Sequence, residues 1–162
     1  MPTDSQIIAS LISQARAALN PTPSLDEFGE WLVYDGYPIT DDRTRSLSVG
    51  VEDPTDPARA DSSDADFTFA HANGRALDET GYVRCALLAW DGGNDIAVAR
   101  DQVDAAFDVL RDRVRHDLTP VGLPGVWSAH ISSTRLYQNA TAEDGVDALR
   151  VFTVAYRARV PH

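Results

Sequence analysis

The stretch Tyr82-Val83-Arg84-Cys85-Ala86-Leu87-Leu88-Ala89-Trp90 decides the fold, because it is apolar at almost every position. Strands with one face in solvent alternate apolar and polar residues, whereas strands buried on both faces read as continuous apolar runs. Arg84 is the only charged residue within this run. We therefore expect residues 82–90 to form the central strand of a β-sheet.

A turn and a long helix follow this strand. The sequence Gly92-Gly93-Asn94-Asp95 consists of turn residues and ends on Asp95, a preferred N-cap residue. Apolar residues then recur with helical spacing at Ile96, Ala99, Val103, Ala106, Phe107, Leu110, Val114 and Leu118. The intervening positions are mostly Asp and Arg, which is typical of a solvated face. The pattern predicts an amphipathic helix over residues 96–118.

The N-terminal region carries a second helical pattern. Its apolar stripe consists of Ile7, Ile8, Leu11, Ile12, Ala15 and Leu19. Pro21 and Pro23 end the pattern, because proline lacks a backbone donor and restricts the residue before it. We expect an N-terminal helix within residues 1–20.

Four further strands complete the expected architecture. Residues 30–34 and 47–51 have strand composition, and residues 126–136 and 149–160 predict a closing antiparallel hairpin. One core is the default for a chain of 162 residues. The prediction is a single α+β domain over residues 1–162, in which two main helices pack on one face of a mostly antiparallel, mixed sheet.

An acidic segment interrupts the strand pattern at residues 53–66. It contains two prolines and five aspartates: Asp53, Asp56, Asp61, Asp64 and Asp66. Such a composition buries too little apolar surface to order itself. We expect an exposed, mobile acidic loop or hairpin tip that serves as a contact site.

Composition excludes several classes of protein. The net charge of −11 argues against specific nucleic-acid binding, which requires a basic surface. All 14 basic residues are arginine, a bias expected of a GC-rich genome. No apolar run approaches the roughly 20 residues of a membrane span, and the N-terminus lacks the pattern of a signal peptide. With Cys85 as its only cysteine, the chain forms no internal disulfide. We expect a soluble protein that folds in a reducing compartment.

The sequence also predicts neither catalysis nor a cofactor. The four histidines, His71, His116, His130 and His162, lack the paired spacing of metal ligands. The acidic segment lacks the alternating ligands and central glycine of a calcium loop. Cys85 lies within an apolar strand rather than at a helix N-terminus, and no serine lies in a nucleophile elbow. We expect no metal and no enzymatic activity.

Several segments, taken in order, resemble one protein family. They are Val33-Tyr34-Asp35-Gly36-Tyr37-Pro38, Val49-Gly50-Val51-Glu52-Asp53-Pro54, Asp78-Glu79-Thr80-Gly81 leading into Val83-Arg84-Cys85, and Phe152-Thr153-Val154-Ala155-Tyr156-Arg157-Ala158-Arg159. In this order the chain resembles tail terminator proteins of long-tailed bacteriophages that infect actinobacteria. Arginine-only basic usage agrees with such a host.

The resemblance implies a subunit of a hexameric ring in the virion, at the head–tail junction, assembled in the host cytoplasm. Such a ring caps the tail tube protein, ends tube polymerisation and joins the head connector (stopper) protein. DNA only passes through the lumen, and an acidic ring would repel its phosphates. Three alternatives remain: another neck component such as a stopper or head-completion protein, an acidic DNA-mimic inhibitor, and a small hydrolase.

A ring requires two different surface patches that fit each other. One possible pairing joins the acidic segment of one subunit to an arginine-bearing strand of the next. The candidate interface residues are Asp53, Asp56, Arg59, Asp61, Asp64, Arg157 and Arg159. This hypothesis predicts salt-sensitive assembly that weakens when Arg157 and Arg159 are replaced by alanine.

Overall fold

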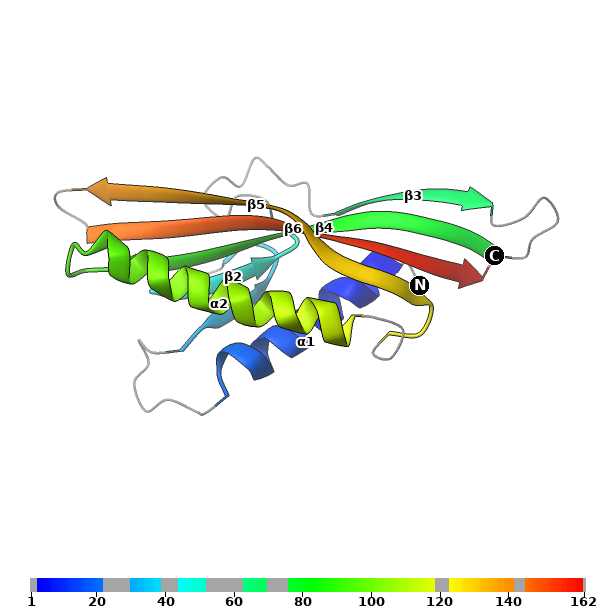
Figure 1. The fold of residues 1–162 in the computed structure, drawn as a ribbon, viewed down its shortest axis with the longest axis horizontal. Helices are drawn as coiled ribbons and strands as arrows, with labels where there is room; N and C mark the ends of the chain where they lie inside the picture. Colours follow the sequence, from blue (N-terminus) through cyan, green and yellow to red (C-terminus); the bar gives the residue numbers. More distant parts are fainter. Residues whose placement is uncertain are drawn as a thin grey trace.

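The predicted α+β architecture is confirmed by a computed structural model, which describes residues 3–21, 30–38, 44–51, 63–69, 76–118, 123–141 and 145–161. This part of the chain forms one six-stranded mixed sheet with two helices on the same face (Figure 1). In chain order the elements are α1 (Thr3–Leu19), β1 (Leu32–Asp35), β2 (Arg45–Val49), β3 (Ser63–Phe69), β4 (Ala76–Asp91), α2 (Ile96–Asp117), β5 (Val126–Thr141) and β6 (Gly145–Pro161).

Strand β4 is the centre of the sheet, as its apolar run predicts. The strand order is β1-β2-β4-β6-β5. Strands β3 and β2 share one edge of β4: β3 pairs with its first half and β2 with its second half. Val83, Cys85 and Leu87 point into the main core beneath the helices. Ala86 and Leu88 belong to a second buried cluster on the other face. The second half of β4 is therefore buried on both faces, as predicted.

Helix α2 covers the long strands β4, β6 and β5. Asp95 caps its N-terminus, where the carboxylate accepts a hydrogen bond from the Ala97 backbone N–H at 2.9 Å. Its buried side chains are Ala99, Val103, Ala106, Phe107, Leu110 and Val114, which follow the predicted stripe. Phe107 packs edge-on against Phe152 of β6, with ring centroids 5.4 Å apart. The helix is thereby fixed across the middle of the sheet.

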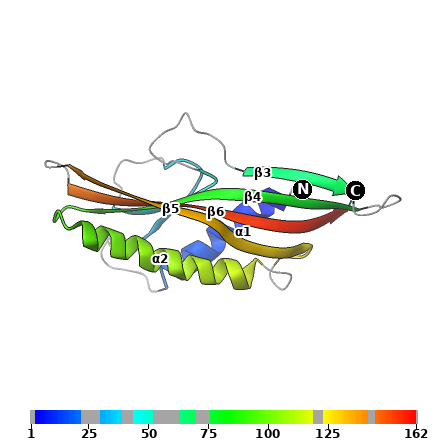
Figure 2. The same cartoon turned by 45° about the horizontal axis from the view of Figure 1, so that its top comes forward.

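Helix α1 packs beside α2 beneath the same face of the sheet, as both views show (Figures 1 and 2). Ile7, Leu11, Ile12 and Ala15 are its buried residues. The Asn20 side chain makes two 2.9 Å hydrogen bonds to the Trp31 backbone, donating to its carbonyl and accepting from its N–H. These bonds tie the end of α1 to the residue that precedes β1.

The remaining strands differ from the prediction in position and length. The strand expected at 30–34 lies at Leu32–Asp35, and the one expected at 47–51 lies at Arg45–Val49. These two strands are parallel neighbours. The closing hairpin of β5 and β6 is antiparallel, as expected, but longer than predicted. Its extra residues include 137–141, a mostly polar segment, and 145–148, which begins with glycine; both pair along the backbone.

The structure corrects the C-terminal end of the predicted acidic loop. Residues 52–62 lie outside the described part of the chain. Asp64 and Asp66, however, lie on β3, which pairs antiparallel with β4. Backbone pairing orders this segment although it is acidic, because strand alternation turns both aspartates to one exposed face.

Candidate functional site: the helix-free face

The face of the sheet that points away from α1 and α2 is the candidate functional site, and we call it the helix-free face. Because side chains alternate along strands, the even-numbered residues of β3 and β4 and the odd-numbered residues of β6 point to this face. Its polar side chains over β3, β4, β6 and β5 include Asp64, Asp66, Asp78, Thr80, Tyr82, Arg84, Arg157, Arg159 and His130.

Strand pairing arranges these side chains in rows across four strands. In one row, Asp66, Thr80, Arg157 and Ser128 lie side by side on β3, β4, β6 and β5. In the next row, Asp64, Tyr82, Ala155 and His130 occupy the same four strands. Acidic groups therefore lie on β3, at one side of the face, and Arg157 lies nearer the opposite side.

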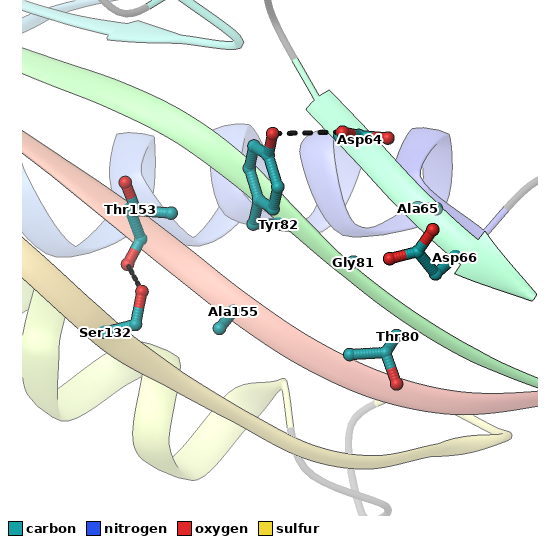
Figure 3. A pocket seen from close by; sticks show the side chains of 9 residues that line it. All are labelled: Asp64, Ala65, Asp66, Thr80, Gly81, Tyr82, Ser132, Thr153 and Ala155. Carbon is teal, nitrogen blue, oxygen red and sulfur yellow. Dashed lines mark hydrogen bonds between the residues drawn. The ribbon is translucent and has the colours of Figure 1, made fainter.

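A shallow hollow lies on this face between β3 and β5 (Figure 3). It is lined by Asp64, Ala65, Asp66, Thr80, Gly81, Tyr82, Ser132, Thr153 and Ala155. The Tyr82 hydroxyl donates a 3.1 Å hydrogen bond to Asp64 across its rim. Its volume of about 210 Å³ is below the roughly 300–1,000 Å³ of small-molecule sites. The hollow is therefore a surface feature of the helix-free face rather than a small-molecule site.

Arg159, one of the predicted interface residues, forms an ion pair within the chain. Its guanidinium contacts both carboxylate oxygens of Asp78, at 2.9 and 3.3 Å, and this hydrogen bonding raises the pKa of Arg159. The guanidinium also lies 4.4 Å from the ring centroid of Trp127, a side chain that is 46% exposed. Arg159 thus positions Asp78 and Trp127 on the helix-free face.

Arg157 and Asp64, also predicted interface residues, both lie exposed on this face. Within the described ranges, Arg157 forms no ion pair, and its neighbours on adjacent strands are Thr80 and Ser128. The structure therefore brings Asp64, Arg157 and Arg159 onto one surface. The other predicted residues, Asp53, Asp56, Arg59 and Asp61, lie outside the described residues.

A buried polar pair supports the hollow from below. The Tyr156 hydroxyl donates a 2.6 Å hydrogen bond to Oε1 of Glu79, and both side chains are only 1% exposed. Tyr156 lies opposite Gly81 on the neighbouring strand, where the absence of a side chain makes room for its ring. Burial, and then the hydrogen bond to Glu79, raise the pKa of Tyr156. Tyr156 therefore stays protonated in the folded protein.

Cys85 gives the protein a testable alkaline sensitivity. Burial raises the pKa of its thiol to about 12, whereas the unfolded chain releases this proton near pH 8.5. The contribution of the Cys85 thiol to the free energy of unfolding is complete below that pH. It falls as the pH rises, by up to about 1.4 kcal/mol per pH unit. In urea unfolding between pH 8 and 10, the free energy of unfolding should fall less steeply with pH for Cys85→Ala than for the wild type. Equal slopes of this free energy against pH would contradict the prediction.

The described residues contain no group of three or more His, Cys, Asp or Glu side chains placed to hold a metal ion. Neither described helix has the length and apolarity of a membrane span. His130 lies on β5 and His116 on α2, apart from each other, whereas His71 and His162 lie outside the described ranges.

Sequence reasoning missed several residues of the helix-free face. Asp78 enters the sequence analysis only within a resembling segment, although it holds Arg159. For Trp127 the sequence allows an interface role but favours core packing, whereas its side chain is 46% exposed. Residues 76–83 give no clear alternation that would indicate Asp78, Thr80 and Tyr82, because the inward positions include Glu79 and Gly81. No sequence signal identifies Trp127, because its exposure depends on an irregularity in the pairing of β5 with β6.

Comparison with known proteins gives a match at the level of structure. No protein-family model and no curated protein matches the sequence. Among solved structures, a chain in the virion of a native gene transfer agent particle is similar, with a TM-score of 0.54 and 16% sequence identity. The alignment covers 94% of each chain. The two chains share a fold over nearly their full lengths.

Proposed function

We propose that this chain is a structural subunit of a phage-like particle, a tail terminator that forms a hexameric ring. The ring caps the tail tube, ends its polymerisation and joins the tail to the head connector. The observation that carries this proposal is the fold shared with a chain of a gene transfer agent virion, which extends over 94% of both chains. The terminator role is supported by the segments between residues 33 and 159 that resemble, in their order, those of tail terminator proteins.

The surface supports a role in assembly rather than in catalysis. The helix-free face presents acidic and basic side chains, one ion pair between Asp78 and Arg159, and a shallow hollow, with Trp127 half-exposed beside them. Aromatic and arginine side chains of this kind are enriched in protein interfaces. Under this proposal the chain needs no cofactor, and its partners are further copies of itself, the tail tube protein and the stopper protein.

The acidic composition fits passage of DNA through the ring. A chain with a net charge of −11, repeated around a lumen, gives a negative potential that repels phosphates and prevents the genome from adhering. Under this proposal the protein lies at the head–tail junction of the virion after assembly in the host cytoplasm. It makes no specific contact with nucleic acid or membrane.

Native mass spectrometry and negative-stain imaging test the proposal. We expect the purified protein, alone or mixed with tail tubes of the same particle, to form hexameric rings that cap one end of each tube. Rings that bind the portal and leave tube ends free would indicate a different neck component. A monomer that binds neither would contradict the structural role and favour the inhibitor alternative.

A further inference from the structure

The sheet has open edges on opposite sides within the described part of the chain. No described strand pairs with the outer side of β5, nor with the outer side of β3. The N–H and C=O groups on such edges are available to another strand. Each edge carries an exposed aromatic side chain, Trp127 on β5 at 46% and Phe67 on β3 at 55%. Both edges therefore have the features of protein contacts.

Strand directions make these two edges compatible. Strand β4 is antiparallel to β3 and to β6, and β6 is antiparallel to β5, so β3 and β5 run in opposite directions. If a second copy, related by rotation, places its β3 beside β5, the new pair is antiparallel, like the adjacent β5–β6 pair. The contact is heterologous, because each copy contributes a different edge, as a closed ring requires.

The charges on the helix-free face match across this contact. From β3 to β5, one row consists of Asp66, Thr80, Arg157 and Ser128, so a short side chain follows each charged one. The next β3 would place another Asp66 beyond Ser128, two strand spacings or about 10 Å from the Arg157 backbone. The long Arg157 side chain can span that gap, because Ser128 is too short to block it. In the neighbouring row, Asp64 of the second copy would adjoin the exposed His130.

The part of β5 that would face the second copy, residues 128–131, lies between two irregularities in strand pairing. They fall between Val126 and Ser128 and between Ile131 and Ser133. Residues 128–131 lie between them in continuous register with β6, and this segment holds both Ser128 and His130. The residues that would face the second copy therefore lie on regular strand backbone.

We propose that β3 of one copy docks antiparallel beside β5 of the next, with Asp66 paired to Arg157 across Ser128. This inference rests on the proposed ring and names its contact. Arg159 takes no part, because its guanidinium is held by Asp78 of its own chain. Arg157 thus forms the intermolecular ion pair, and Arg159 the intramolecular one.

A charge-swap experiment tests this contact. Native mass spectrometry and sedimentation would compare the wild type with Asp66→Arg, Arg157→Glu and the double variant, alone or with tail tubes. We expect each single reversal to raise the subunit concentration at half-assembly by at least about tenfold, because it places like charges together. The double variant restores the opposite pairing and should assemble within about threefold of the wild type.

Matched controls reverse equivalent charges on α2, away from the helix-free face. Asp101→Arg and Arg115→Glu make the same charge changes at exposed positions and should leave assembly unchanged. Circular dichroism would verify that every variant is folded. If the wild type forms rings and the single reversals assemble normally, or if the double variant fails to recover, this contact is wrong while the ring stands. A wild type that forms no ring overturns both proposals.

Discussion

Gly81→Ala is expected to lower the free energy of unfolding by about 2–3 kcal/mol, because a methyl group does not fit at this position. A Cβ atom at Gly81 would lie 2.6 Å from the Tyr156 hydroxyl oxygen and 2.7 Å from the Asp64 backbone oxygen. Tyr156 is buried and hydrogen-bonded to Glu79, and Asp64 lies on the paired strand β3, so neither atom can move away freely. Urea unfolding at pH 7 measures the loss.

Gly93→Ala is the matched control for this substitution. Its Cβ would lie 3.0 Å from Oδ2 of Asp91, the far end of a flexible side chain. Both substitutions reduce the entropy of the unfolded chain equally, so this contribution cancels in the comparison. We expect Gly93→Ala to change the unfolding free energy by no more than about 0.5 kcal/mol. Equal stabilities of the two variants would show that Tyr156 does not fill the space opposite Gly81.

Tyr156→Phe is expected to destabilise the protein by roughly 1–3 kcal/mol, because it leaves a buried carboxyl group without a donor. Glu79 is 1% exposed, and its Oε1 receives the 2.6 Å bond from Tyr156. Its Oε2 already lacks a hydrogen-bond partner in the described structure. Removing the hydroxyl therefore leaves the whole carboxyl group unsatisfied. Chemical denaturation of the wild type and the variant gives the difference.

Removal of both polar groups should reverse most of this loss. In the double variant Glu79→Leu/Tyr156→Phe neither position carries an unsatisfied polar group, so its stability should exceed that of Tyr156→Phe. Tyr137→Phe, at an exposed tyrosine on β5, controls for the loss of a hydroxyl and should be close to neutral. A double variant less stable than Tyr156→Phe would show that Glu79 has a favourable interaction beyond the hydrogen bond to Tyr156.

The elements with strong local patterns could be predicted from the sequence. The apolar run at 82–90 identifies the central strand, and the spacing from Ile96 to Leu118 identifies α2 with its Asp95 cap. In both cases the burial of an element follows from its own residues. The antiparallel closing hairpin follows similarly, because β5 and β6 adjoin in the chain and pair with each other.

The candidate site depends on contacts between distant residues, which local patterns do not encode. Arg159 and Asp78 are 81 positions apart, and only the pairing of β6 with β4 brings them together. Asp64 and Asp66 have the composition of a loop, and β4 makes them part of a strand. The hydrogen bond that buried Glu79 receives likewise comes from Tyr156, which lies on another strand. The sequence names Asp64, Arg157 and Arg159 as candidates, but it does not indicate that strand pairing places them on one face.

The pairing of β4 with β6 determines how the subunit would respond to mechanical load. The two strands pair from Ala76 with Pro161 to Asp91 with Val146 without a register shift. Antiparallel hydrogen bonds lie perpendicular to the strands, so a pull along the strands shears all of them at once. A pull across the strands would instead break them one after another. The β4–β6 pair therefore resists tension along β4 better than tension across it, and an assembly that aligns β4 with the direction of tension would use the stronger direction of this pair.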